Sequence, residues 1–360
     1  MMNASETHFF RRTCCLIAPA LIAVAPWASA EIVTSGLIQD LDADVGVVEA
    51  GGEGSGVTAW ENQAAAGGDD VTTDRGTITL TSSDESINNH NFVTLPSGGP
   101  SPRMVGDDAE AFDGIMTGTG HTWFAVVRPE VDANPGRKNA IFGTLQNSNP
   151  FSGVVAHVSS NNSLGYMLRP ANSDAFVDGT TSVNDGEWHI LAGRLEAGTG
   201  GQLAEAFTNG PVAEASLSIN ILDSSISDAL TVGAERTGGG ENYLGDIARI
   251  LIYNRPLDDE ELNQTGFTLG ELYGITNSFE GSSEPLRFLS IRFDHTTREV
   301  DVTWNSKPGS NYKFEISDNL QNWFEVTDNF PSQGETTTFT DESVTDTTLR
   351  RYYRVTELGN

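Results

Sequence analysis

From residue 31 to about residue 275, short runs of β-type hydrophobic residues alternate with clusters of turn-forming residues. Glycine, asparagine, aspartate and serine fill the breaks, and these residues favour turns. No helical pattern separates most of the runs, so we expect antiparallel strands in sheets that pack face to face. The clearest predicted strands cover 77–81, 122–127, 153–158, 188–195, 203–208, 230–233 and 247–253.

One helix is predicted near the end of this region. Asp258 can cap its first turn, Glu261 can reach back to the cap, and Leu257 and Leu262 are placed to form a hydrophobic staple. We interpret the acidic residues at this helix start as caps aligned with the helix dipole rather than as a catalytic cluster.

The other end of this helix is marked by two glycines. We expect an interruption at Gly266, a second helical stretch over 269–273, and a left-handed end at Gly274.

A second β pattern follows a short polar segment. Residues 276–284 are small and polar, which predicts a linker. About six or seven alternating strands over 285–360 predict a small β-sandwich of the immunoglobulin or fibronectin type III kind. The alternating apolar positions are Leu289, Ile291 and Phe293, then Val300, Val302 and Trp304, then Tyr312, Phe314 and Ile316, and finally Tyr353 and Val355.

The first thirty residues have the features of a cleaved signal peptide. Arg11 and Arg12 precede an apolar run over 14–27, and small residues at 28–30 suit signal peptidase, so we expect cleavage before Glu31. A twin-arginine route stays open. The run is too short for a comfortable membrane span, and nothing later approaches the roughly 20 apolar residues that a bilayer requires. The predicted location is therefore secreted or at the cell surface.

Composition narrows the possible functions. The 360 residues include 50 acidic and 20 basic side chains, a formal net charge of −30, which repels nucleic acid. The two cysteines, Cys14 and Cys15, both lie in the predicted signal peptide. A mature chain without them would have no disulfide, no thiolate metal site and no cysteine nucleophile.

Several motifs carry a family resemblance. They are VNDGEWHILAGR at 183–194, FTNG at 207–210, LTVGA at 230–234, YLGDIARILIYNRPLDDEEL at 243–262, and FDG at 112–114 ahead of TWFAVV at 122–127. In order and spacing they resemble laminin G-like, concanavalin A-like jelly-roll domains of secreted bacterial proteins. The resemblance implies an all-β fold: an antiparallel jelly-roll sandwich over 31–275 with one short C-terminal helix. Residues 285–360 resemble a fibronectin type III-like module often appended to such proteins.

A loop near the start of the domain also resembles its relatives. The stretch 60–69 reads WENQAAAGGD and follows an aspartate-rich strand, as in secreted bacterial relatives, with alanines in place of the usual Ser-Gly stretch.

Enzymes of this superfamily include glycoside hydrolases and polysaccharide lyases, so catalysis has to be considered. A glycoside hydrolase needs two carboxylates that flank the scissile bond. The glucanase string E-x-D-x-x-E, the lyase patterns R-x-E-x-R and Q-x-H, and the G-x-S-x-G nucleophile motif are all missing from the sequence. The histidines after the signal peptide have no metal-ligand spacing. They are His90, His121, His157, His189 and His295.

Asp40, Asp42 and Asp44 form the clearest candidate metal site. On a strand these alternating residues would point to one side, and three carboxylates there would suit Ca²⁺. The alternative is an exposed acidic face without a cation.

Candidate sugar-binding residues are the aromatic and amide side chains expected on loops or on a concave sheet face. We select Trp60, Tyr166, Asn242 and Tyr243, whereas Trp123, Trp188, Trp304 and Trp323 are assigned to the core.

These observations favour an exported, non-catalytic binding or adhesion protein. Its expected partner is a glycan or another cell-surface or extracellular ligand, with no nucleic acid and no membrane span. The alternative is a polysaccharide-degrading enzyme whose catalytic groups lie in the loops around 84–108 or 146–182.

Overall fold

The fold is taken from a computed structural model of the chain, which describes sixteen stretches of residues. They are 32–51, 54–65, 67–107, 110, 112–116, 118–131, 139–149, 151–170, 173–198, 200–220, 228–239, 241–280, 286–306, 310–334, 336–345 and 350–358. The predicted signal peptide at 1–30 lies outside the described residues and stays a prediction.

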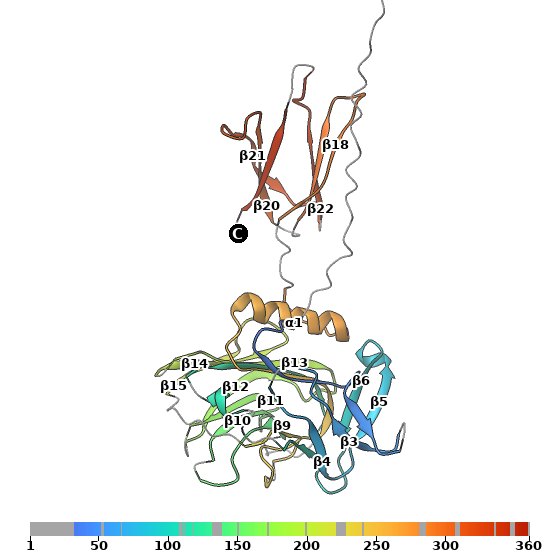
Figure 1. Cartoon of the computed structure of the whole chain (residues 1–360), viewed down its shortest axis with the longest axis vertical. Coiled ribbons are helices and arrows are strands. Elements are labelled where there is room, and N and C mark those ends of the chain that lie inside the picture. Colours follow the sequence, from blue (N-terminus) through green and yellow to red (C-terminus); the bar gives the residue numbers. More distant parts are fainter. Residues whose placement is uncertain are drawn as a thin grey trace, which may run out of the picture.

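The first part of the chain forms two antiparallel sheets, which confirms the expected jelly-roll sandwich (Figure 1). The eight-stranded sheet has the order β15-β14-β13-β8-β17-β6-β5, with β1 paired to β17. Its strands are β1 (Leu37–Asp42), β5 (Thr79–Asp84), β6 (His90–Leu95), β8 (His121–Pro129), β13 (His189–Leu195), β14 (Gln202–Thr208), β15 (Ala215–Ile219) and β17 (Gly245–Tyr253).

The nine-stranded sheet has the order β12-β11-β10-β9-β16-β7-β4-β3-β2. Its strands are β2 (Val47–Glu49), β3 (Val57–Trp60), β4 (Val71–Arg75), β7 (Arg103–Val105), β9 (Asn139–Gly143), β10 (Gly153–Val158), β11 (Ser163–Arg169), β12 (Ala175–Ser182) and β16 (Thr231–Val232). Two short 3-10 helices, η1 (Glu85–Ile87) and η2 (Asp113–Met116), lie in the connections.

Strand β8 is apolar on both faces because both of its faces are covered. Trp123 and Ala125 join the core between the two sheets. Phe124 and Val126 point the other way, into a second core that includes Leu262 and other residues of the helix α1. Successive strand residues alternate between faces, so one continuous hydrophobic run serves two cores.

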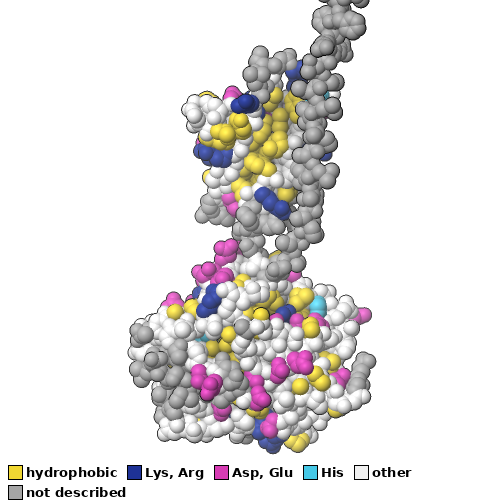
Figure 2. Space-filling model, in the orientation of Figure 1, with side chains coloured by type: hydrophobic (Ala, Val, Ile, Leu, Met, Phe, Trp, Pro, Cys, Tyr) yellow, Lys and Arg dark blue, Asp and Glu magenta, His cyan; other side chains and the backbone are white. Residues whose placement is uncertain are grey.

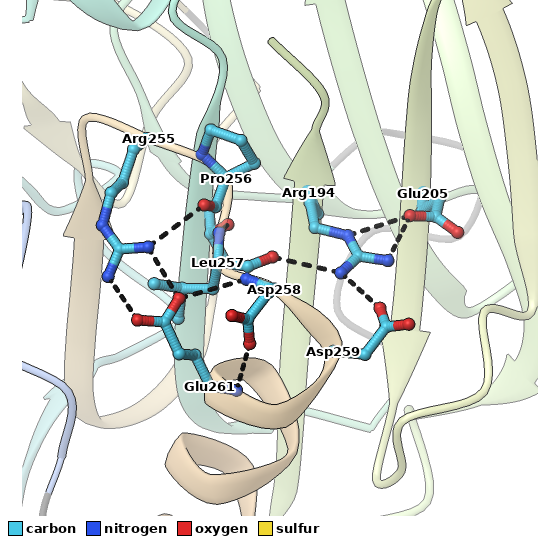
Figure 3. A network of polar contacts seen from close by, with 9 residues as sticks. Arg194, Glu205, Arg255, Pro256, Leu257, Asp258, Asp259 and Glu261 are labelled. Carbon is cyan, nitrogen blue, oxygen red and sulfur yellow. Dashed lines mark hydrogen bonds and ion pairs between the residues drawn. The ribbon is translucent and has the colours of Figure 1, made fainter.

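Helix α1 (Asp259–Tyr273) begins as predicted. The Asp258 side chain accepts from the Glu261 backbone at 2.8 Å, and Glu261 accepts from the Asp258 backbone at 3.1 Å. Arg255 holds the Glu261 carboxylate in a bidentate pair, and this hydrogen-bonded pair lowers the pKa of Glu261. Figure 3 shows this network at the helix start.

A second arginine ties the same helix start to the sheet. Arg194 on β13 donates to Glu205 on β14 at 2.7 Å and to Asp259 at 2.7 Å (Figure 3). The acidic residues at the helix start therefore act as caps and ion-pair partners, as the sequence analysis expected.

The predicted interruption at Gly266 is wrong, because α1 runs through this position. The glycine has a packing role: a Cβ at Gly266 would lie 2.5 Å from the Phe279 ring. The predicted end at Gly274 is confirmed, with a φ of +67°.

The predicted linker is partly packed. Phe279 is buried against α1, the Ser278 backbone donates to the Asn209 carbonyl at 2.8 Å, and the Glu280 backbone donates to the Asn263 side chain at 2.7 Å. Residues 281–285 lie outside the described residues. The jelly-roll body therefore extends to residue 280.

The second module is a small β-sandwich of two three-stranded antiparallel sheets, β18-β19-β22 and β21-β20-β23. Its strands are β18 (Phe288–Phe293), β19 (Val300–Asn305), β20 (Asn311–Ser317), β21 (Phe324–Pro331), β22 (Thr336–Asp341) and β23 (Tyr352–Leu358). Trp304, Tyr312 and Phe314 are buried in its core. The finer fibronectin type III assignment stays a prediction.

Trp323 is not a core residue, contrary to the sequence expectation. Its ring is partly exposed, and the Arg354 guanidinium lies 4.4 Å from the ring centroid. Among the helices in the described stretches, none has the length and apolar character needed to cross a membrane.

Candidate functional site

One outer face of the jelly roll is covered by helix α1, and the other carries a polar pocket. Figure 1 shows α1 along the eight-stranded sheet, with β4 on the opposite side of the sandwich. On β4 and β7, Val71 and Met104 enter the core, whereas Thr72 and Val105 are direct cross-strand neighbours on the other face. The outer face of the nine-stranded sheet therefore holds the candidate site.

The loop 61–70 forms one wall of this pocket, and Asn62 fixes its shape. The Asn62 side chain accepts from the backbones of Asp40 and Ala64, and donates to the carbonyls of Ile38 and Gly67. These four bonds are 2.8–3.0 Å long and use every hydrogen-bonding position that an amide of this kind commonly fills. Asn62 is therefore a structural centre of the loop.

A second amide attaches the loop to β1. Gln39 donates to the Asp69 carbonyl at 2.7 Å and accepts from the Asp69 backbone N–H at 2.8 Å. Gly68 beside it has a φ of +67°, and a Cβ there would lie 2.0 Å from the Ile38 carbonyl oxygen. Only glycine fits this conformation and this close approach. The loop that resembled its relatives thus has a defined role in positioning the pocket wall.

The pocket has a volume of about 940 Å³ and a lining rich in oxygen atoms. Its lining residues are Asn62, Ala64, Gly67, Gly68, Asp69, Asp70, Thr72, Thr73, Asp74, Val105, Gly106 and Asp107. No aromatic ring and no lysine or arginine is among these described lining residues.

The four carboxylates of the pocket differ in their surroundings. Asp69 is buried and lies against Gly106, where a Cβ would be 1.7 Å from its Oδ2. Asp70 accepts from the Asn62 backbone at 2.7 Å, and Asp74 forms an ion pair with Arg103 at 2.6 Å. Asp107 is exposed and has no partner among the described residues. The pocket thus presents hydrogen-bond acceptors with one neighbouring positive charge.

The predicted metal-site residues are held by an arginine and a histidine. Arg249 on β17 makes two bonds of 2.8 Å to the Asp40 carboxylate and lies 3.0 Å from Asp42. Burial raises the pKa of Asp42, and the charge of Arg249 opposes this shift. The guanidinium therefore supplies the positive charge that these buried carboxylates need.

The expectation that all three aspartates share one face is wrong for Asp44. Strand β1 ends at Asp42, and the chain turns there, with the Gly46 backbone donating to the Asp42 carbonyl. Asp44 instead pairs with His90 Nδ1 at 2.6 Å and accepts from the Asn91 backbone at 2.8 Å. No group of three or more His, Cys, Asp or Glu residues in the described stretches is arranged to hold a metal ion. Calcium at 40–44 thus has no geometric support.

Trp60 and Tyr166 were selected as exposed rings, and that expectation is wrong. Both side chains are fully buried in the core between the sheets. The Tyr166 hydroxyl donates to His121 Nε2 at 2.5 Å, and burial raises the pKa of this tyrosine well above its ordinary value.

Asn242 and Tyr243 are buried as well. Asn242 donates to the Gly233 carbonyl at 3.1 Å, and the Tyr243 hydroxyl donates to the Asp246 carbonyl at 3.1 Å. Because their polar atoms satisfy the backbone, these side chains stabilise the fold, and none of the four selected residues lines the pocket.

Two further histidines sit in structural contacts. His189 lies 2.9 Å from both the Asp185 carboxylate and the Asn209 amide, so it fixes the turn before β13. His157 is buried on β10, with its ring over Gly165, where a Cβ would be 2.2 Å from Nε2.

Sequence reasoning missed the acidic residues of the pocket. The family-like loop 60–69 pointed to this place, but its tryptophan was chosen and its aspartate was not. Asp69 ends that loop and Asp70 follows it directly, whereas Asp107 comes from a separate segment after β7. Pairing of β4 with β7 brings residues 69–70 close to residue 107, and no local sequence motif predicts that pairing.

The comparisons with known proteins concern the fold. Among curated proteins no match was found. The CBM40 module of the Ruminococcus gnavus IT-sialidase, bound to α2,3-sialyllactose, is 14% identical, with 55% of this chain and 98% of that chain covered and a TM-score of 0.38. Domain 4 of AbnA, an extracellular arabinanase from Geobacillus stearothermophilus in complex with arabinotriose, is 14% identical, with 67% and 100% covered and a TM-score of 0.42.

A third similar structure is botulinum neurotoxin type C, whose cell entry depends on interaction with two ganglioside molecules. It is 12% identical, with 81% of this chain and 62% of that chain covered and a TM-score of 0.47. The laminin G-like resemblance is confirmed where a family model matches: residues 106–263 fit the family described as the concanavalin A-like lectin/glucanases superfamily.

Proposed function

We propose that this protein is an exported, non-catalytic protein that binds a glycan in the pocket beside β4 and β7. The observation that carries the proposal is the pocket itself. Its volume of about 940 Å³ lies in the range of roughly 300–1,000 Å³ that small-molecule sites occupy.

The lining of the pocket suits a ligand with many hydroxyl groups. Asp70 and Asp107 offer exposed carboxylate oxygens. The hydroxyl of Thr72 donates to the carbonyl of Val105, so its oxygen is oriented as a further acceptor. Sugar hydroxyls can donate to such acceptors, and bonds to charged groups are the stronger ones.

The charge of the pocket narrows the glycan class. Four carboxylates line it, and the neighbouring Arg103 is engaged by Asp74. A ligand with carboxylate or sulfate groups would be repelled, because like charges in a concave site are unfavourable. We therefore expect neutral or amine-bearing glycans to bind better than acidic ones.

The surroundings of the described histidines do not support acid–base catalysis by a histidine at the pocket. His121 is enclosed in the core with Tyr166, and His189 is held by Asp185 and Asn209. A general acid or base must reach the substrate, and none of these side chains lines the pocket.

A glycan array tests the proposal with the mature chain, residues 31–360, produced alongside two variants. Asp107→Asn removes an exposed carboxylate that has no partner in the described part of the chain, and it should weaken binding of neutral glycans several-fold. Glu271→Gln removes one charge from the exposed side of α1, away from the pocket, and should bind like the parent.

Three outcomes would contradict the proposal. If the parent chain binds no glycan on the array, glycan binding by this pocket is excluded. Equal binding by the parent and by Asp107→Asn would place the site elsewhere. Release of reducing ends or of unsaturated products from a polysaccharide panel, lost in a pocket variant, would show the alternative, a polysaccharide-degrading enzyme.

A further inference from the structure

Two strands of the second module expose apolar side chains that a closed β-sandwich would bury. On β18, Phe288, Ile291 and Phe293 are 41%, 55% and 41% exposed. On β21, Phe324 and Val326 are 63% and 43% exposed. Figure 2 shows hydrophobic side chains gathered on this module, with lysine or arginine side chains beside them. Exposed apolar surface of this extent commonly marks an interaction site.

Both strands lie at the edges of their sheets. The order β18-β19-β22 places β18 at one edge, and the order β21-β20-β23 places β21 at another. An edge strand leaves backbone N–H and C=O groups open to pairing with a further strand. From Ser290 to Phe293, β18 keeps a regular register with β19, so this stretch is straight enough to accept one.

The two edges carry opposite charges. Strand β18 contains Arg292 and no acidic residue, whereas β21 contains Glu325 and Asp328 and no basic residue. Arg292 is exposed and forms no ion pair within the described residues, although Asp301 lies directly opposite it on β19. Glu325 is half-exposed and pairs with Lys313 at 3.1 Å. In a chain with net charge −30, a basic apolar edge is unusual, and an acidic apolar edge complements it.

An antiparallel register aligns two of these features. When 292–293 lies against 324–325, Phe293 faces Phe324 and Arg292 faces Glu325, and the match ends there because the register of β21 with β20 is irregular at Val326. Directly opposed residues lie on the same side of a sheet, so the aromatic pair lies on one side and the ion pair on the other. A slip by one residue would place Arg292 opposite an apolar side chain and lose both matches.

We propose that β18 of one copy of this chain pairs with β21 of a second copy. The contact joins two different surfaces, so a bound pair still offers one free β18, on one copy, and one free β21, on the other. Such heterologous contacts extend into open chains unless the rotation closes a ring. The protein would therefore self-associate through its second module and display several jelly-roll domains along one assembly.

Sedimentation velocity on the mature chain, residues 31–360, tests this contact. Over roughly 1 µM to 1 mM, the span of weak protein contacts, the average mass should rise with concentration. Salt near 1 M should weaken association, because it screens exposed charges. Arg292→Glu and Glu325→Arg should each weaken association about tenfold, since each places like charges opposite one another.

Exchanging the charges of Arg292 and Glu325 distinguishes this contact from non-specific association. The double variant R292E/E325R should recover self-association, and an equimolar mixture of the two single variants should associate with one another. Val212→Glu changes an exposed apolar residue of the jelly roll, 78% exposed, and should behave as the parent. Far-UV circular dichroism and thermal melting verify that all variants are folded.

The proposal would be overturned by a chain that is monomeric at every concentration. It would equally fail if the single variants associate like the parent, if the double variant does not recover association, or if Val212→Glu abolishes it. The last result would indicate a non-specific apolar contact instead of the paired edges.

Discussion

His121 is fully enclosed by the core and makes a hydrogen bond with each ring nitrogen. Nδ1 donates to the Ile115 carbonyl at 2.6 Å, and Nε2 accepts from the Tyr166 hydroxyl. With Nδ1–H donating to a carbonyl, the neutral imidazole has its lone pair on Nε2, facing the Tyr166 hydroxyl, and burial favours this neutral form. Burial lowers its pKa from 6.5 to about 4.

The folding stability should therefore fall in mild acid. Above pH 6.5 the histidine is neutral in both states and contributes no pH dependence. Between pH 6.5 and 4, His121 binds a proton in the unfolded chain but not in the folded chain. The free energy of unfolding therefore decreases as the pH falls. The loss reaches about 3 kcal/mol, at 1.36 kcal/mol per pKa unit. Below pH 4 this contribution is constant.

Urea unfolding of the jelly roll at pH 8, 6 and 5 measures this effect. His121→Gln removes the titrating group and should have a flatter pH profile than the parent, although it is less stable at pH 8. His295→Gln, at an exposed position of the second module, should keep the parent profile. Equal slopes for the parent and His121→Gln would show that another group dominates.

Arg249 offers a second prediction at the scale of single residues. Arg249→Met would leave the buried carboxylates of Asp40 and Asp42 without a counter-charge, and this should cost about 3–5 kcal/mol of unfolding free energy. Arg255→Met removes a more exposed pair with Glu261 and should cost about 1 kcal/mol or less.

Adding calcium to the parent and to Asp42→Ala tests the calcium expectation. Because Arg249 already neutralises the predicted cation site, adding calcium to the parent should leave its melting temperature unchanged. A clear rise of the melting temperature with calcium, lost in Asp42→Ala, would support the cation site.

For the arginine variants, equal losses of unfolding free energy in Arg249→Met and Arg255→Met would show that Asp40 and Asp42 have no special dependence on Arg249.

Helix α1 depends on contacts that its own sequence does not contain. Gly266→Ala should favour the isolated helix by about 1 kcal/mol, since alanine has the better propensity. In the folded chain its Cβ would meet the Phe279 ring at 2.5 Å. Overpacking of this kind costs about 1–3 kcal/mol, so the net effect should be destabilising.

A double-mutant cycle with Phe279→Ala isolates this contact. Phe279→Ala alone should destabilise the chain by about 3 kcal/mol, the usual cost of removing a buried ring. The double variant should be more stable than the sum of the two single losses predicts, because the alanine no longer meets a ring. Strict additivity would mean that the backbone yields at no cost.

The success of sequence reasoning at the element scale follows the range of the interactions. The cap at Asp258 and the left-handed end at Gly274 were predictable because their partners lie within four residues. The break at Gly266 was predicted wrongly because its reason, Phe279, lies thirteen residues away in a segment taken for a linker. Strand positions such as Gly153–Val158 follow from local apolar runs and were found.

Side-chain orientation was harder to predict than strand position. Tyr166 and Trp60 carry polar atoms that suggested exposure, but the sheet turns both rings inward. Strands apolar on both faces, such as β8, give no alternation from which the inward face could be read. The pocket escaped prediction because 69–70 and 107 meet only when distant strands pair.

At the scale of the whole molecule, the jelly roll and the second module have separate hydrophobic cores. The jelly roll, with its helix, encloses large clusters around Trp123 and Phe124. The second module has a small core around Trp304 and Phe314. No strand of the second module pairs with a strand of the first among the described residues. We therefore expect the two parts to unfold independently.

Calorimetry of residues 31–360 should resolve two transitions. The second module has fewer than about 80 residues and buries a smaller fraction of its surface, so it should melt first. Phe314→Ala should lower only this transition, by several degrees or more. His121→Gln should affect only the later one. If β18 and β21 join copies as proposed, the first transition should also rise with protein concentration, because association stabilises the folded module by mass action. A single transition that shifts as a whole in both variants would show that the modules unfold as one unit.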